Sequence, residues 1–302
     1  MQSNVAAAAV PTEPGRHSLY GKKRRTSDIL LKSCIYLSTA VTVIALLGIL
    51  GYILAKGIPY ISWQFISTPY SETKANLKGI LPMIINTMYI VVITLLIAAP
   101  IGISSALYLT QYAKQGKLVK AIRFTTEILS GIPSILFGLF GYTVFCILFR
   151  LQTSILAGCL TMTICILPTI IRTTEESLLA VPSSYKEGAM ALGSGKLRVI
   201  IGIVLPCAMP GVLTAVILAM GRIVGESAAL LFTSGLAYNM PKGFTQQIFS
   251  SGRTLTLHLY QTAMEASTPD ALHIAFATAT VLLILVFLLN RLASLLSKAL
   301  RK

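Results

Sequence analysis

An arginine within an apolar stretch is the first candidate for chemistry in this chain. Arg222 lies in the run Gly221-Arg222-Ile223-Val224-Gly225-Glu226, and Glu226 would share its helix face four residues later. An arginine inside a membrane span is costly unless it faces protein, water or a counter-charge. We therefore expect Arg222 to recognise an anion, with Glu226 holding its charge until the anion arrives. A purely structural, self-neutralised pair is the alternative.

A second arginine, Arg172, follows Pro168-Thr169-Ile170-Ile171 at the predicted end of another apolar run. An arginine at such an end is commonly a snorkelling anchor. Two arginines at different depths would also form a track for an oxyanion, because the guanidinium fork matches phosphate geometry. The residues alone indicate a small anion, with an oxyanion as the favoured class. They leave open whether Arg172 is a ligand or an anchor.

The polar, glycine-punctuated stretch Glu187–Pro206 separates two apolar runs and predicts a short helix. Ser184 and Glu187 have the spacing of a capping box, which marks a helix start. Gly193 suits the left-handed position that ends a helix.

Tyr185, Ala189 and Leu192 would form one apolar face of that helix. A helix of about two turns is unstable alone in water, so it needs a surface on which to dock. We expect a cytoplasmic partner to receive it. An ordinary capped helix in a loop between spans is the alternative.

Several glycines and prolines predict bends. Gly131 and Pro133 follow Glu127 near the start of an apolar run, where they favour a hinge or a substrate-facing break. Packing through small residues is an equally good explanation. Pro206 and Pro210 each remove a helix hydrogen bond and are expected to bend the entry of the following span.

Composition identifies an integral membrane protein. Only 12% of the 302 residues are charged, compared with about 25% in soluble domains. The net charge of +15 does not indicate nucleic acid, because the basic residues are dispersed at span ends rather than interleaved with aromatic ones. The basic cluster at residues 22–25 is a topology signal or, less favoured, a contact with anionic lipid.

Enzyme and metal-binding motifs are lacking. The Gly193–Leu197 segment lacks the first glycine and the final hydroxyl of a phosphate-binding loop. The three histidines are scattered and the five cysteines show no Cys-x-x-Cys spacing, so we expect no cofactor, metal site or disulfide in this chain.

Apolar runs of about 20 residues can cross a bilayer, and the sequence predicts six such helices. They lie at about residues 29–55, 79–112, 125–149, 154–171, 208–234 and 271–289. The expected division is a cytoplasmic N-terminal arm (1–27), a first span with an outer loop (28–78), a membrane core (79–291) containing the docking loop 180–206, and a cytoplasmic tail (292–302). The outer loops at residues 56–78 and 235–270 should form short irregular or helical pieces.

Orientation follows from the distribution of Lys and Arg. With the N-terminus inside, 18 of the 25 basic residues are cytoplasmic, six are outside and Arg222 lies within a span. Both termini and the docking loop are therefore expected on the cytoplasmic side.

The stretch Glu187-Gly188-Ala189, three residues, Gly193, nine residues, Ile203-Val204-Leu205-Pro206 resembles the EAA loop of ABC-transporter permeases. Gly188 departs from the usual alanine. Further stretches resemble the PstA family of phosphate permeases: residues 127–138 (EILSGIPSILFG), 168–175 (PTIIRTTE), 221–230 (GRIVGESAAL) and 254–260 (TLTLHLY).

The resemblance implies a type I importer permease with a MetI-like core in a bacterial plasma membrane, where both termini are cytoplasmic. It implies a PstC-like sister permease, a PstB-like ATPase dimer that binds ATP and Mg, and a PstS-like phosphate-binding protein. Carried over by position, Arg172, Arg222 and Glu226 become phosphate-path residues. The ATPase-coupling residues become Glu187, Gly188, Ala189, Gly193, Leu205 and Pro206.

Other readings stay open. The transported oxyanion could be sulfate, molybdate or phosphonate. The chain could instead sense phosphate for a partner kinase without moving it, or be an ion-coupled carrier with no use for the docking loop. A membrane enzyme is the least favoured class.

Overall fold

The computed structural model describes residues 26–70, 78–240, 243–264 and 269–299. The regular elements in these ranges are all helices, which confirms the expected all-α class. The chain divides into two units, Met1–Gly51 and Tyr52–Lys302. Most of helix α1 (Thr26–Gly57) belongs to the first unit, and it is long and apolar enough to cross a membrane. The arm expected at residues 1–27 lies almost wholly outside the described residues.

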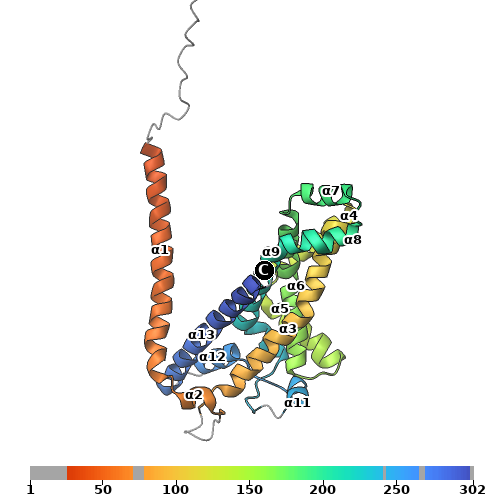
Figure 1. The fold of residues 1–302 in the computed structure, drawn as a ribbon. Coiled ribbons are helices and arrows are strands. Elements are labelled where there is room, and N and C mark those ends of the chain that lie inside the picture. The colour runs from red at the N-terminus through yellow and green to blue at the C-terminus, as the bar shows by residue number, and fades with distance from the viewer. Residues whose placement is uncertain (1–25, 71–77, 241–242, 265–268, 300–302) are drawn as a thin grey trace, which may run out of the picture. The chain divides into compact units, whose positions relative to one another are not determined.

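The second unit consists of helices joined by short connections. In chain order they are η1 (Ile58–Tyr60), α2 (Trp63–Ser67), α3 (Leu81–Leu107), η2 (Tyr108–Tyr112), α4 (Lys117–Gly131), α5 (Ser134–Gly141), η3 (Tyr142–Leu148), α6 (Ile155–Leu179), α7 (Ser183–Ala191), α8 (Lys196–Val199), η4 (Ile200–Val204), α9 (Leu205–Gly225), α10 (Ala228–Thr233), α11 (Phe244–Ile248), α12 (Leu255–Met264) and α13 (Pro269–Ala299). Figure 1 shows α7 and α8 at one end of this unit and α2 and α11 at the other. We call these the α7 end and the α2 end.

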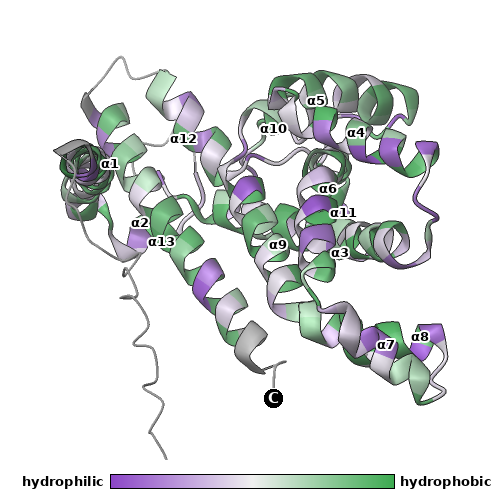
Figure 2. Cartoon of the chain, turned by 90° about the horizontal axis from the view of Figure 1, so that it is seen from above, coloured by the Kyte–Doolittle hydropathy of each residue, from purple (hydrophilic) through white to green (hydrophobic). Residues whose placement is uncertain are grey.

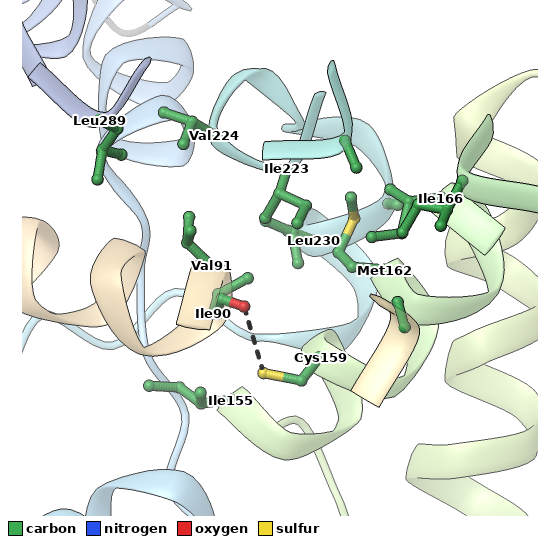
Figure 3. Packing of buried hydrophobic residues seen from close by; sticks show 14 of the residues in the cluster. Ile90, Val91, Ile155, Cys159, Met162, Ile166, Ile223, Val224, Leu230 and Leu289 are labelled. Atoms are coloured by element: carbon green, nitrogen blue, oxygen red, sulfur yellow. Dashed lines mark hydrogen bonds between the residues drawn. The ribbon is translucent and has the colours of Figure 1, made fainter. Parts of the chain in front are cut away.

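The main core lies where α3, α6 and α9 meet, with α10 and α13 beside them. Its centre is formed by Ile90, Met162, Ile166, Ile223 and Leu230, none more than 2% exposed. Figure 3 shows these side chains pointing toward one another, with the Cys159 thiol facing the carbonyl of Ile90 at 4.0 Å. The long helices are mainly apolar, whereas α4, α7 and α8 carry hydrophilic segments (Figure 2).

Two glycines permit the close approach of α6 to its neighbours. A Cβ at Gly102 of α3 would come within 2.6 Å of the Ile170 side chain, and one at Gly211 of α9 within 2.0 Å of the Ser177 hydroxyl. Small residues at such crossings are typical of helix packing in membranes. They fix α6 tightly between α3 and α9.

The number of membrane crossings agrees with the six expected if one bent pair of helices counts as a single span. Five helical stretches pass the length and hydropathy test: Asp28–Tyr60, Leu81–Tyr112, Ile155–Leu179, Lys196–Gly225 and Asp270–Leu295. The sixth candidate joins Lys117–Gly131 to Ser134–Leu148, which are bent by 101° relative to each other.

The third span expected at residues 125–149 thus corresponds to a broken pair of helices that begins earlier, at Lys117. Residues before proline avoid the helical region, and Ile132 is extended, with φ −70° and ψ 132°, directly before Pro133. A Cβ at Gly131 would meet nothing within 4 Å, so this glycine is not required by packing. Of the two readings of Gly131 and Pro133, the break is the one that the structure contains.

Three other helices have ends that differ from expectation. Helix α6 continues past residue 171 to Leu179, because Leu178 is buried against the start of α9. The fifth span begins at Lys196 rather than 208, because Val199 and Val204 pack into the same cluster, and it ends at Gly225 rather than 234. Helix α13 runs through position 291 without a break, although a separate tail was expected from residue 292.

The two loops at the α2 end form short helical pieces, as expected, in the parts that the structure describes. Polar side chains of α3 hold the second of them: Asn86 accepts a hydrogen bond from Gln247 Nε2 at 2.8 Å, and Thr87 Oγ1 accepts one from the Leu255 amide at 3.0 Å. These groups are buried, so their satisfied hydrogen bonds fix the loop in place.

Helix α12 carries a buried histidine, His258, with 0% exposure. Within the described residues its ring nitrogens have no hydrogen-bond partner, and its ring meets Tyr70 edge-on at 5.0 Å. Burial lowers the pKa of His258 from 6.5 to about 3, and the nearby positive charge of Arg253 acts in the same direction. The histidine is therefore held neutral.

Stability should consequently fall as the pH is lowered. Between pH 6.5 and 3 the unfolded chain binds a proton at His258 that the folded chain does not bind, and each pH unit in this window costs about 1.4 kcal/mol. The unfolding temperature of the purified protein should drop between pH 7 and pH 5, and His258→Leu should remove part of that drop. An identical pH dependence in the two proteins would contradict a buried, neutral His258.

Candidate functional site

Helix α7 occupies the predicted docking stretch, but its start differs from the prediction. The helix begins at Ser183, after Pro182 as N-cap, and Pro182 offers no side-chain cap. The capping box of Ser184 and Glu187 is therefore wrong, because Ser184 already lies inside the first turn. The fixed φ of proline suits a helix entry, but its side chain has no acceptor, so α7 begins without a side-chain cap.

The end of α7 agrees with the prediction. Gly193 has φ +81°, its amide donates to the Met190 carbonyl at 2.9 Å, and the Ser194 amide donates to the Ala189 carbonyl at 3.2 Å. These two bonds form a Schellman motif, which favours glycine because a Cβ is strained in the left-handed region. A side chain at Gly188 would meet nothing within 4 Å, and the helix runs through this glycine.

Helix α7 has no buried residue and exposes large apolar side chains. Leu192 is 88% exposed and Tyr185 is 54% exposed, whereas Ala189 packs partly against the helices of its own chain. The exposed part of the predicted apolar face is thus available to a partner. Glu187 is also exposed.

The helices at this end also contact α3. Lys186 Nζ of α7 donates to Gln111 Oε1 at 3.2 Å, and Lys196 of α8 lies 4.7 Å from the centre of the Tyr112 ring. Gln111 and Tyr112 belong to η2, a π-helical turn that continues α3. A displacement of α7 would therefore act on η2 as well as on α9.

The entry of α9 contains a π-helical turn, η4, directly before the two prolines at which a bend was expected. The stretch Lys196–Gly225 passes as a single span, with Pro206 in the first turn of α9 and Pro210 inside it. Leu205 packs partly into the adjoining core, whereas Pro206 is exposed.

Arg222, near the far end of α9, reaches α6. Its Nη1 donates to Thr169 Oγ1 at 3.5 Å, a long hydrogen bond at the middle of α6. Within the described residues, Arg222 has no carboxylate at salt-bridge distance. The side chain is partly buried. A guanidinium of this kind has most of its donors available for an anion.

The expected pairing of Arg222 with Glu226 is absent, because α9 ends between them. Glu226 is extended, with φ −80° and ψ 124°, so the four-residue helical spacing no longer applies. Its Oε1 instead accepts a hydrogen bond from the Ala229 amide at 3.2 Å, in the first turn of α10. Both Arg222 and Glu226 remain near the Cys165 thiol of α6.

Arg172 lies one turn beyond Thr169 on α6, and it is paired with carboxylates. Its Nε contacts Glu176 Oε1 at 3.2 Å and its Nη1 lies 3.9 Å from Glu127 Oε1 of α4. The side chain is 57% exposed and lines a pocket of about 290 Å³ between α4 and α6. The two arginines thus lie along one face of α6, one paired and one without a carboxylate.

Sequence reasoning missed the ion pair between Arg123 of α4 and Glu175 of α6, whose nearest atoms are 2.5 Å apart. It also missed Glu176. The four-residue spacing from Arg172 to Glu176 was available as a signal. The pairing of Arg123 with Glu175 was not, because it depends on the angle that the break at Pro133 sets between α4 and the helices that follow.

Comparisons with known proteins agree with this architecture. Residues 98–302 match the family described as "Binding-protein-dependent transport system inner membrane component". The "Probable ABC transporter permease protein YqgI" of Bacillus subtilis is 35% identical over 278 residues, 88% of this chain and 94% of that protein. The "Phosphate transport system permease protein PstA" of Haemophilus influenzae is 33% identical over 273 residues, 88% and 92% of the two chains.

Two solved transporters have a similar fold. The inward-facing methionine transporter MetNI has a TM-score of 0.57 at 19% identity and covers 74% of this chain and 95% of that one. A bacterial alginate ABC transporter, solved with a periplasmic protein that binds alginate pentasaccharide, has a TM-score of 0.67 at 15% identity and covers 91% and 96%. The MetI-like fold and the resemblance to PstA are confirmed. The chain belongs to the binding-protein-dependent transport system inner membrane component family and is a multi-pass permease subunit of an ABC importer.

Proposed function

We propose that this chain forms half of the translocation path of an ATP-driven importer of inorganic phosphate. The observation that carries the proposal is Arg222, a guanidinium on a span helix with no carboxylate at salt-bridge distance among the described residues. Arginine binds tetrahedral oxyanions through its fork of N–H donors. Relatives named as phosphate permeases, such as the Haemophilus PstA protein, supply the choice of phosphate among the oxyanions.

In this proposal the anion first meets Arg222, with Thr169 beside it, and then passes along α6 toward Arg172. Binding must stay weak, because a path that holds phosphate tightly could not release it. Glu226 contributes a nearby negative charge and the cap of α10 rather than a direct ion pair with Arg222.

Coupling to ATP hydrolysis is proposed to occur through α7. Its exposed Leu192 and Tyr185 would enter a groove of a PstB-like ATPase dimer that binds ATP and Mg. A PstC-like sister permease would supply the other half of the path, and a PstS-like protein would deliver phosphate at the α2 end. The α7 end would face the cytoplasm, in keeping with the basic residues near it, such as Lys117, Lys120 and Lys196.

Uptake of radiolabelled phosphate into vesicles carrying the assembled complex tests the substrate. Uptake should require ATP and should be reduced by unlabelled phosphate far more than by equal sulfate, molybdate or phosphonate. Equal competition by another oxyanion would indicate that the importer also accepts that anion, so phosphate would not be its specific substrate. Uptake that persists without ATPase activity would contradict the proposal, and phosphate-dependent signalling without uptake would favour a sensor.

A further inference from the structure

Two ion pairs join α4 to α6 in an antiparallel pattern. Arg123 and Glu127 lie one turn apart on α4, and they face Glu175 and Arg172 of α6. The positive Arg123 of α4 faces the negative Glu175 of α6. The negative Glu127 of α4 faces the positive Arg172 of α6. These contacts position the middle of α4 next to α6.

The two pairs differ greatly in shielding from solvent. The Arg123–Glu175 pair is 2.5 Å long, and its carboxylate side chain is only 12% exposed. The Arg172–Glu127 pair is 3.9 Å long, and its side chains are 57% and 70% exposed. Solvent and salt screen an exposed pair strongly, so it contributes little to stability and opens readily. The Arg172–Glu127 pair is the labile one.

The labile pair lies between the shielded pair and the break in the chain. Glu127 is about 6 Å along α4 from Arg123 and about 6 Å from Gly131, at 1.5 Å per residue. The extended residues Ile132 and Pro133 follow, and Gly131 has no close neighbour at its Cβ position. The last two turns of α4 can therefore move about the shielded pair and the break once the labile pair opens.

The pocket between these helices is connected to the docking helix. Leu109 of η2 lines the pocket together with Arg123, Glu127 and Arg172. The same turn, η2, holds the partners of Lys186 and Lys196 from α7 and α8. Movement of α7 would thus reach the pocket through one short π-helical turn.

We propose that Glu127 is a positioning residue for transport: it occupies Arg172 while the pocket is closed and withdraws so that Arg172 can bind the anion. This inference rests on the proposed function, since it takes the anion at Arg172 to be phosphate. In the closed arrangement the carboxylates of Glu127 and Glu176 both lie close to the guanidinium of Arg172, and their negative charges exclude phosphate from it. Withdrawal of the last two turns of α4 removes one of these carboxylates, Glu127.

A matched pair of variants tests the role of Glu127. Glu127→Gln removes the contact between helices, whereas Glu176→Gln removes a carboxylate of Arg172 that lies on the same helix and cannot hold α4. Spin labels on Thr126→Cys and Leu179→Cys, both on the pocket rim, report the α4–α6 distance in the assembled complex, with the exposed Cys34 and Cys207 replaced by serine. A second label pair, Leu118→Cys with Leu179→Cys, reports on the segment before the shielded pair.

Glu127→Gln should raise the fraction of long Thr126–Leu179 distances about two- to fivefold, the shift expected from losing one exposed ion pair in a two-state equilibrium. High salt should open the wild type in the same way, and Glu176→Gln should leave the distances unchanged. Inorganic phosphate should favour the long distance more than chloride of equal ionic strength, but not in Arg172→Gln. The Leu118–Leu179 distance should stay constant throughout.

Equal effects of Glu127→Gln and Glu176→Gln, or none from either, would overturn the inference. So would a Leu118–Leu179 distance that changes together with the Thr126–Leu179 distance, because α4 would then move as a whole. The distances are read without measuring uptake. If Arg222→Gln leaves phosphate uptake intact, the proposed function fails while the opening of α4 can still be observed, so the two failures are distinguishable.

Discussion

Replacing Arg222 with glutamine is expected to reduce ATP-dependent phosphate uptake by about 100-fold or more, because two charge-assisted hydrogen bonds worth about 1.5 kcal/mol or more each are lost. Arg222 contacts the Thr169 hydroxyl at 3.5 Å and lies near the Cys165 thiol, but within the described residues it has no carboxylate at salt-bridge distance, so the substitution breaks no ion pair among them. Arg222→Lys keeps the charge but loses the planar fork, and should fall between wild type and glutamine. Initial uptake rates in vesicles with equal amounts of assembled complex provide the measurement.

The control for this substitution is Thr169→Ala. It removes the hydroxyl that Arg222 contacts and leaves the guanidinium in place. Its uptake should stay within about twofold of wild type, because a neutral hydrogen bond of this length contributes little. If Arg222→Gln transports phosphate normally while the ATPase stays bound, Arg222 is a structural residue. The structure would then no longer support an oxyanion as the substrate.

The sequence was sufficient for the class of fold and for the existence and end of the short helix α7, because both depend on local signals. Long apolar runs predict spans wherever they occur, and Gly193 ends α7 with φ +81° as its position predicts. Composition alone separated this chain from soluble proteins. These features do not depend on how distant helices meet.

Helix ends were harder to predict, because tertiary packing decides them. Burial of Leu178 and Val199 extends α6 and the entry of α9 well beyond the most apolar residues. Helix α9, in contrast, ends earlier than expected, at Gly225. This end removes the helical spacing on which the predicted Arg222–Glu226 pair depended. A prediction that pairs residues by spacing fails when the helix stops between them.

The charged contacts around Arg172 also depend on tertiary packing, here between residues that lie far apart in the chain. The 101° bend after Gly131 turns α4 so that Arg123 meets Glu175, which is 52 residues away in the chain. Pro133 predicted a break but not its direction. The two arginines of the expected anion track are therefore not equivalent: Arg222 lacks a carboxylate partner within the described residues, whereas Arg172 has two.

Placing a charge on the exposed apolar face of α7 should disconnect the ATPase. Leu192→Asp replaces a side chain that is 88% exposed here and proposed to be buried in the partner. Burying a leucine contributes about 1.5–3 kcal/mol, and a buried unpaired carboxylate adds a further cost, so ATPase association should weaken by about 30-fold or more. Co-purification of the ATPase with the permease, and binding titrations in detergent, measure the loss.

The matched control is Ser184→Asp, which adds the same charge to the same helix without touching Leu192. Ser184 is exposed in the first turn of α7, where a carboxylate is favourable to the helix dipole. Association should therefore survive in Ser184→Asp and fail in Leu192→Asp, with uptake following association in each case. If both variants lose the ATPase equally, repulsion by negative charge explains the loss. If neither does, α7 is an ordinary loop helix and coupling must occur elsewhere on this chain.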